Sequence, residues 1–195
     1  MLPFVGLTGG IGAGKSTALQ ALQRLGAATL STDRVVHELY EDPEVSDAVV
    51  DRFGDGVQRD DAIDRAALAR VAFATAEDRQ WLESLLWPRV GRRMAAWRQR
   101  VETGEPRPLA AVIEVPLLFE SGLDHGFDAT IAVIADERTR EARAGARGHE
   151  AVAERGARQL SREEKSQRAT YTVRNDSTPA ELEAQLSAIL DMLVR

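Results

Sequence analysis

The stretch "GLTGGIGAGKST", residues 6 to 17, decides the fold. It lies between an apolar run, residues 2 to 7, and a helical pattern that begins near Thr17. Within it, Gly9-x4-Gly14-Lys15-Ser16 fits the phosphate-binding pattern G-x-x-x-x-G-K-[ST]. Glycines let backbone N–H groups point at phosphate oxygens, and the helix that follows adds the positive end of its dipole. A plain glycine turn would explain the glycines but not the Lys-Ser pair, so the stretch predicts a nucleotide-phosphate site.

The residues of this loop have separate predicted roles. Lys15 reaches the β- and γ-phosphates, and the Ser16 hydroxyl ligates Mg²⁺, so the predicted cofactors are ATP and Mg²⁺. The residues predicted to hold the nucleotide here are Gly10, Ile11, Gly12, Ala13, Gly14, Lys15, Ser16 and Thr17.

The composition limits the class of protein. With 195 residues, 44% of them hydrophobic and 29% charged, the chain is long enough to bury a full core. No apolar run approaches the roughly 18 to 20 residues that span a bilayer, and the N-terminus lacks signal-peptide features, so we expect a cytoplasmic protein without a membrane partner. The absence of cysteine excludes disulfides and cysteine nucleophiles. A net charge of -6 argues against a nucleic-acid partner.

Five short apolar runs predict a parallel sheet. Two of them, "PLAAVIEVP" (108 to 116) and "DATIAVIAD" (128 to 136), are near-continuous, as expected of strands buried on both faces. The other three cover residues 2 to 7, 27 to 30 and 170 to 174. Leucines at helical spacing fill the interval between the first two runs and also the C-terminal segment from Leu182 to Leu193. Gly26 is a plausible end for the first of these helices. The order strand, glycine loop, helix, strand predicts an α/β fold.

Two longer segments interrupt this pattern. About 75 residues separate the second and third strands, too many for a simple crossover, and their pattern is helical from Val45 through Arg100. The segment from Glu137 to Arg168 is rich in Arg and Glu and has few large apolar residues, so we expect it to be mobile. The chain is then one unit, 1 to 195, in three parts. These are a core (1 to 33, 106 to 136 and 169 to 195), a helical insertion (34 to 105) and a lid (137 to 168).

Several classes of phosphate-loop protein fit poorly. A GTPase needs an Asn-Lys-x-Asp signature, and the single asparagine, Asn175, is followed by Asp176. Motor and unfoldase ATPases are generally longer chains. A compact chain with a helical insertion and an arginine-rich segment is typical of a small-molecule kinase, in which one insertion holds the acceptor and another closes over ATP.

Further short motifs follow the loop in order: "VGLTGGIGAGKST" (5 to 17), "STD" (31 to 33), "VPLLFESGL" (115 to 123), Gln159 with "REEK" (162 to 165), and Asn175. Together these motifs, which cover nearly the whole chain, resemble the dephospho-coenzyme A kinase family. The resemblance implies a P-loop kinase-like, three-layer α/β/α fold with a five-stranded parallel sheet, a helical acceptor-binding insertion and a small helical lid. It also implies a phosphotransferase that uses ATP to phosphorylate the ribose 3'-hydroxyl of dephospho-coenzyme A, the final step of coenzyme A biosynthesis. We expect a monomer or a small homo-oligomer.

Asp33 is the predicted catalytic carboxylate. By resemblance it orients or deprotonates the acceptor hydroxyl and helps to hold the metal. Asp33 could also cap a helix over residues 34 to 40, and the two roles can coexist. Glu114 and Glu120 are further candidates for an outer-shell magnesium carboxylate, although Glu114 could instead be buried beside an arginine.

The remaining site residues also come from the resemblance. The resemblance implies that Arg143 is catalytic and that Arg147 binds ATP. Arg140, Arg143 and Arg147 recur at spacings of three and four, so a helix would place them on one face, from which they could clamp phosphates. The alternative is a solvated face paired with Glu137 and Glu141. The predicted wall of the acceptor site consists of Pro116, Leu117, Leu118 and Phe119.

Asn175 belongs to a loop that packs against the adenine in family members, although the same residues could form a simple turn before the last helix.

Three departures from the family pattern leave the substrate open to alternatives. Trp87-Pro88 replaces a usual His-Pro pair, the lid between Arg147 and Gln159 is short, and Ala169-Thr170 replaces Ala-Asp. One alternative is another small kinase that acts on a nucleoside monophosphate or a different metabolite. The other is a binding protein that uses ATP only to change shape.

Overall fold

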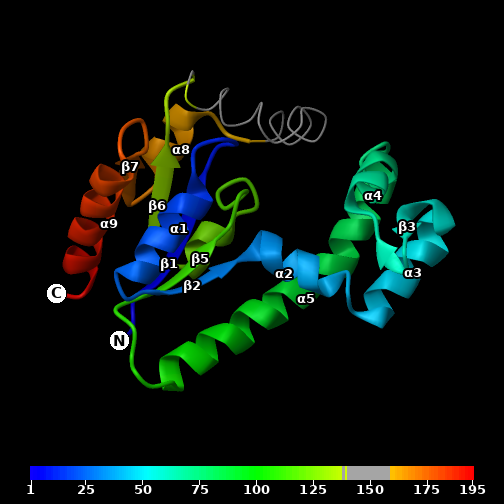
Figure 1. The fold of residues 1–195 in the computed structure, drawn as a ribbon, viewed down its shortest axis with the longest axis horizontal. Helices are drawn as coiled ribbons and strands as arrows, with labels where there is room; N and C mark the ends of the chain where they lie inside the picture. Colours follow the sequence, from blue (N-terminus) through cyan, green and yellow to red (C-terminus); the bar gives the residue numbers. More distant parts are fainter. Residues whose placement is uncertain (138, 140–158) are drawn as a thin grey trace. The chain divides into compact units, whose positions relative to one another are not determined.

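The structure is a computed structural model that describes residues 1–137, 139 and 159–195 (Figure 1). Two compact units make up the chain. The first contains residues 1–31 and 98–195, and the second contains residues 32–97. The predicted lid falls largely on residues outside the described part, so the division into core, insertion and lid stays a prediction.

The first unit is built on a parallel sheet, as predicted. In the described part of the chain its five strands lie in the order β2-β5-β1-β6-β7, and every neighbouring pair is parallel. The strands are β1 (Phe4–Gly9), β2 (Ala28–Ser31), β5 (Ala111–Glu114), β6 (Ala129–Ile134) and β7 (Tyr171–Arg174). All five expected strands are therefore confirmed, each displaced by a few residues at most.

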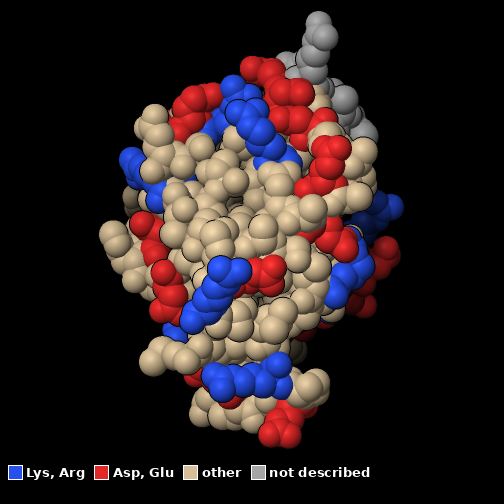
Figure 2. Space-filling model, turned by 90° about the vertical axis from the view of Figure 1, so that its left-hand side faces the viewer, with Lys and Arg blue, Asp and Glu red and all other residues tan. Residues whose placement is uncertain are grey.

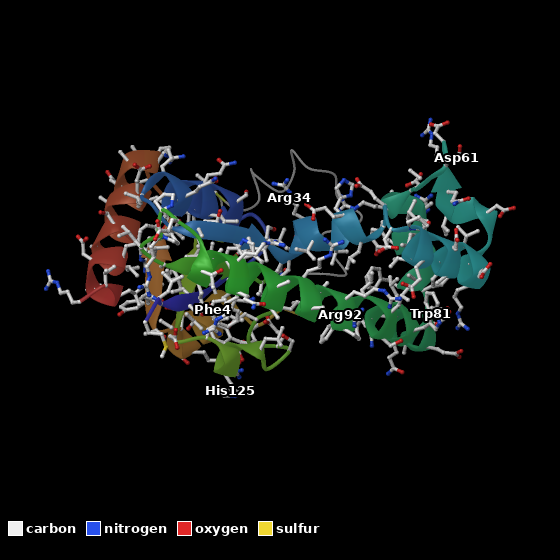
Figure 3. All side chains as sticks on the ribbon, turned by 90° about the horizontal axis from the view of Figure 1, so that it is seen from below. Phe4, Arg34, Asp61, Trp81, Arg92 and His125 are labelled. Carbon is white, nitrogen blue, oxygen red and sulfur yellow. The ribbon has the colours of Figure 1, made fainter. Side chains whose placement is uncertain are left out.

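Alternation along β1 assigns its two faces. Val5 and Leu7 are fully buried in the core beneath α1 (Lys15–Arg24) and α9 (Pro179–Leu193). Residues of opposite parity face the other way. There Phe4, labelled in Figure 3, stacks on Phe127 at 4.6 Å between ring centroids, and the Arg98 guanidinium lies 4.2 Å from the Phe4 ring centroid. Because β1 is buried on both faces, it reads as a continuous apolar run in the sequence.

Helices cover both faces of this sheet. α1 and α9 pack against each other on one face, where their surface carries an ion pair between Arg24 and Glu183 (2.6 Å). α8 (Arg162–Arg168) contacts β6 and β1, and η2 (Leu123–Gly126) precedes β6. On the face drawn in Figure 2, the described acidic and basic side chains are interspersed rather than gathered by sign.

Gly26 ends the first helix, as the sequence indicates. Its φ of 95° lies in the left-handed region, which a residue without Cβ adopts at little cost. The Ala27 N–H donates to the Leu22 carbonyl and the Gly26 N–H to the Gln23 carbonyl, the paired bonds of a Schellman motif. The chain then turns directly into β2.

The second unit is mainly helical. Its elements are α2 (Thr32–Leu39), α3 (Pro43–Phe53), η1 (Asp55–Val57), β3 (Gln58–Arg59), β4 (Ala62–Ile63), α4 (Arg65–Ala72) and the first part of α5 (Ala76–Thr103). The prediction of helix throughout this segment is wrong at β3 and β4, which form a short antiparallel hairpin. Asp60 and Asp61 take φ values of 51° and 60° at its turn (Asp61 is labelled in Figure 3), as two-residue hairpin turns require.

A cluster around Trp81 stabilises this helical unit. Trp81 packs edge-on against Phe53 at 5.5 Å between centroids, and the Arg52 guanidinium lies 5.9 Å from its ring centroid. Arg52 also pairs with Asp78 at 2.8 Å and Glu77 at 3.0 Å, which raises the pKa of the guanidinium. Among the helices that the structure describes, none is long and apolar enough to cross a membrane.

Candidate active site

The candidate site lies at the carboxyl edge of the parallel sheet. β1 is flanked by β5 on one side and β6 on the other, with Leu7 opposite Glu114 and Gly9 opposite Val133. The connection after β1 leads towards one edge of the sheet, and that after β6 towards the other. Ligands of open α/β sheets bind at such a reversal, outside the carboxyl ends of the strands. The phosphate loop follows β1 at this point.

Gly9 is required by the packing of β1 against β6. A Cβ on Gly9 would come closer than 3.0 Å to the Val133 carbonyl oxygen and within 3.3 Å of the Lys15 side chain. The glycine therefore lets the end of β1 and the start of the loop lie against the neighbouring backbone.

Two further glycines turn the loop. Gly12 and Gly14 take φ values of 76° and 89°, which side chains rarely adopt, and the Ala13 N–H donates to the Gly10 carbonyl at 3.2 Å. Gly14 is the N-cap of α1 and supplies no side-chain acceptor. The first turn of α1 therefore presents backbone donors and the positive end of the helix dipole at the loop. This arrangement suits a phosphate group.

Lys15 points back over its own loop. Its ammonium group donates to the carbonyls of Gly9 at 3.1 Å and Gly10 at 3.3 Å. The Ser16 and Thr17 side chains are exposed beside it. A cation, a row of amides and a free hydroxyl are thus gathered in one turn of chain, as the sequence predicts for this stretch.

Asn175 is buried beneath the loop. Its side-chain amide donates to the Ala13 carbonyl at 2.9 Å, and only 5% of the residue is exposed. Its backbone N–H donates to the Ile134 carbonyl at the end of β6. Its predicted contact with a nucleotide stays a prediction. The structure adds a second role, which is structural. From its position directly after β7, Asn175 holds the Ala13 carbonyl of the phosphate loop in place.

Lys165 is the other lysine of the chain, and it is almost completely buried. Its ammonium group lies 2.9 Å from the Glu120 carboxylate and donates to the Pro116 carbonyl at 3.0 Å. No role is predicted for Lys165 from the sequence, although lysine occurs only at positions 15 and 165 of this arginine-rich chain. Glu120 is bonded to Lys165 and accepts from the Leu160 N–H at 2.8 Å, and its predicted link to a metal stays a prediction.

Lys165 lies on a short helix with a complete N-terminal cap. The Ser161 hydroxyl accepts from the Glu164 N–H, and the Glu164 carboxylate accepts from the Ser161 N–H at 2.8 Å. That backbone bond, followed by the Ser161 side chain, lowers the pKa of Glu164.

The predicted acceptor wall divides into buried and accessible parts. Leu118 is fully buried, with its side chain against Gly6 of β1, and Phe119 is 6% exposed. Pro116 and Leu117 are half-buried. The first pair therefore anchors the turn, and only the second pair retains surface for a substrate in this structure. Glu114, at the end of β5, is 6% exposed, and its predicted link to a metal stays a prediction.

Asp33 lies in the second unit, two residues after β2 ends. It is exposed in the first turn of α2, which begins at Thr32, so Asp33 is not the residue that precedes the helix. Its carboxylate makes no hydrogen bond or ion pair with another described residue. Arg140, Arg143 and Arg147 lie outside the described residues, and their predicted roles remain predictions.

Two of the departures from the family pattern have a clear structural setting. Thr170, where an aspartate is usual, exchanges hydrogen bonds with Thr130, each hydroxyl accepting from the other residue's N–H at 3.0 Å. This exchange joins β6 to the start of β7. Trp87 is 48% exposed on α5, next to the proline within that helix.

Known proteins are similar to this chain in both sequence and fold. A family model described as dephospho-CoA kinase matches residues 3–181. A dephospho-CoA kinase from Deinococcus radiodurans is 40% identical over 97% of this chain and 91% of its own length. A crystal structure of a Thermus thermophilus protein superposes with a TM-score of 0.82 at 32% identity, covering 98% of both chains. A dephospho-CoA kinase from Campylobacter jejuni shares the fold (TM-score 0.65, 20% identity, 98% of this chain and 97% of its own).

Proposed function

Because the chain belongs to the dephospho-CoA kinase family, we infer that it catalyses ATP-dependent phosphorylation of dephospho-CoA in coenzyme A biosynthesis. The γ-phosphoryl group moves from ATP to the ribose 3'-hydroxyl, and the products are coenzyme A and ADP. The observation that carries this proposal is the phosphate loop after β1, with Lys15 over a row of backbone donors, in a chain that matches the family over residues 3–181.

The loop residues bind the phosphates of ATP. Lys15 exchanges its contacts with the Gly9 and Gly10 carbonyls for contacts with the β- and γ-phosphates. Backbone amides of the loop and of the first turn of α1 donate to the same oxygens, and the dipole of α1 stabilises their negative charge. These groups neutralise charge as the phosphoryl group moves.

The residues present also fit Mg²⁺. No cluster of three or more His, Cys, Asp or Glu side chains occurs among residues 1–137, 139 and 159–195. A magnesium ion that is held mainly by substrate phosphates and water needs no such cluster. The exposed Ser16 hydroxyl would hold the ion, with Glu114 at the end of β5 as an outer carboxylate. When bound, Mg²⁺ screens the phosphate charge.

Asp33 is the proposed orienting group for the acceptor. Its carboxylate accepts a hydrogen bond from the ribose 3'-hydroxyl and takes the proton as the oxygen attacks in line. The support is its position two residues beyond β2, since the carboxyl ends of parallel strands lie at the edge that also carries the phosphate loop. Arg143 and Arg147 are proposed to neutralise the β- and γ-phosphates.

The activity assay uses the purified full chain with ATP and Mg²⁺. Dephospho-CoA, AMP and adenosine are offered separately as acceptors, and ADP release is measured together with coenzyme A formation. Stimulation by dephospho-CoA alone, with one coenzyme A formed for each ADP, is the expected result. Preference for AMP would indicate a nucleoside monophosphate kinase. ATP binding without transfer to any acceptor would indicate a nucleotide-gated binding protein.

Asp33→Ala tests the orienting role. Turnover should fall by at least about 10²-fold, the usual contribution of a positioned base, while ADP affinity stays within about threefold of the wild type. Asp47→Ala is the matched control, because Asp47 is an exposed aspartate of the same unit. Normal turnover by Asp33→Ala would remove this residue from the mechanism.

We also propose that the protein acts in the cytoplasm as a monomer or a small homo-oligomer, without a nucleic-acid or membrane partner. Light scattering on the eluting peak of a gel-filtration column measures the oligomeric state directly.

A further inference from the structure

The buried Lys165–Glu120 pair has no part in the reaction described above. Lys165 is 1% exposed, and its ammonium group contacts the Glu120 carboxylate and the Pro116 carbonyl oxygen. Removing a lysine and a carboxylate from water is costly, and replacing such a pair by apolar residues is often neutral for stability. A simple gain in stability therefore explains this pair poorly.

The Pro116 carbonyl oxygen is a shared acceptor. Besides Lys165, it accepts from the Thr8 hydroxyl at 3.3 Å, and Thr8 is fully buried. Thr8 directly precedes Gly9, the residue at which β1 enters the phosphate loop. One oxygen atom thus connects the turn at 116–119, the helix α8 and the strand that carries the loop.

Glu120 continues the same set of contacts on its other side. Its Oε1 accepts from the Leu160 N–H at 2.8 Å, and the preceding residue, Gln159, accepts from the Ile11 N–H of the phosphate loop at 3.2 Å. The contacts form a closed circuit from the loop through residues 159–160, Glu120, Lys165, Pro116 and Thr8 back to the loop. All of these residues belong to the first unit.

The two oxygens of the Glu120 carboxylate have different surroundings. Glu120 Oε2 is buried and has no hydrogen-bond partner in the described part of the chain. The contacts of the Glu120 carboxylate with Lys165 and with the Leu160 amide are both made at Oε1. Such a carboxylate holds its position only while Lys165 remains opposite it.

We propose that Lys165 and Glu120 are positioning residues that set the distance between the 116–119 turn and the phosphate loop. The proposal rests on the proposed function and on the predicted position of this turn as a wall of the acceptor site. Since displacing a reacting group by about 1 Å can cost roughly 10²-fold in rate, release of the turn lowers turnover. Nucleotide binding is less affected, because Asn175 still holds the loop through Ala13.

Two variants separate positioning from a merely structural role. Lys165→Met leaves the Glu120 charge buried and unpaired, so it should also lower the melting temperature. The double variant Lys165→Met/Glu120→Gln removes both charges and should melt close to the wild type. Its kcat should nevertheless stay about 10- to 100-fold low, whereas its ADP dissociation constant, measured by calorimetry, stays within about threefold.

Two further variants serve as a second test of the same contacts and as a control. Thr8→Val removes the second donor to the Pro116 carbonyl and should lower kcat in the same direction by a smaller factor. Arg24→Met is the matched control, because it breaks an exposed ion pair with Glu183 in the same unit and should leave kcat within about twofold of the wild type.

Amide hydrogen exchange gives a readout that needs no acceptor. The Ser121 and Leu123 N–H groups donate within the turn, to the carbonyls of Leu117 and Leu118. Their exchange should accelerate in the double variant and not in Arg24→Met. Unchanged exchange, or a double variant with wild-type kcat, would overturn the positioning role. A wild type that forms no coenzyme A would refute the proposed function instead, and the exchange measurement would then decide the positioning role alone.

Discussion

Substituting Gly9 by alanine tests whether the end of β1 has to lie against β6. The added methyl group would approach the Val133 carbonyl oxygen more closely than the 3.0 Å that real Cβ atoms keep. That oxygen belongs to the backbone of a central strand, so it cannot rotate away as the tip of a side chain can. The clash can be relieved only if β1 and β6 separate at Gly9. The Gly9 carbonyl, which accepts a hydrogen bond from Lys15, would then move as well.

The clash of the added methyl group determines how much stability Gly9→Ala should lose. Overpacking a tight site costs about 1–3 kcal/mol, and for a chain of this size each kcal/mol lowers the melting temperature by about 2–4 °C. We therefore expect Gly9→Ala to melt about 2–12 °C below the wild type. Displacement of the loop should also weaken ADP binding by about tenfold, which corresponds to about 1.4 kcal/mol.

Thermal melting with and without ADP, together with calorimetric titration, measures both effects. Gly126→Ala is the matched control in the same unit, because a methyl group at Gly126 has no neighbour within 4 Å. That control should melt within about 1 °C of the wild type. If Gly9→Ala melts like the control and binds ADP normally, the close approach of β1 to β6 does not constrain the loop.

Two other changes probe what surrounds the loop and α8. Asn175→Ala leaves the Ala13 carbonyl without its buried donor, so stability measured by urea denaturation should fall by about 1–3 kcal/mol, and ADP affinity should fall with it. Asn175→Ala that binds ADP like the wild type would refute the support of the loop by this residue. Glu164→Gln tests the cap of α8, because the pKa of Glu164 is lowered in the folded state by its bond from the Ser161 N–H. A carboxyl group whose pKa is lowered on folding stabilises the folded protein at pH values above its pKa in the unfolded chain, which is about 4.3. This stabilisation is lost as the pH falls through the lower pKa of the folded state. The melting temperature of the wild type should therefore exceed that of Glu164→Gln at pH 7 and approach it below about pH 4, and a constant difference would contradict the assignment.

Local patterns in the sequence account for the parts of the fold that were predicted. The five strands are apolar runs with turn residues at both ends, and Gly26 and the phosphate loop carry their own backbone requirements, so each can be recognised within a few residues. The β3–β4 hairpin was missed because two-residue strands are too short to show alternation. Its one signal was the Asp60-Asp61 pair, since aspartate tolerates the left-handed turn.

Contacts between distant residues account for the parts of the site that were missed. Lys165 and Glu120 are separated by many residues and belong to different elements, and no spacing rule links them. The burial of Leu118 likewise depends on Gly6 of β1, which offers it space by having no side chain. Rarity was the only available signal. Lys165 is one of two lysines and Asn175 is the single asparagine, and both prove to be buried donors to backbone carbonyls.

The central position of β1 has a consequence for the order in which the chain folds. Both neighbours of β1 come from far along the sequence, and the Phe4 N–H donates to Asp128, which is 124 residues away. The second unit, by contrast, is one continuous segment, 32–97, whose contacts are local. Since local contacts form sooner than distant ones, this helical unit can fold during synthesis before β5 and β6 are available to pair with β1. The nucleotide site that follows β1 can therefore be completed only after β5 and β6, which come much later in the chain, have been synthesised.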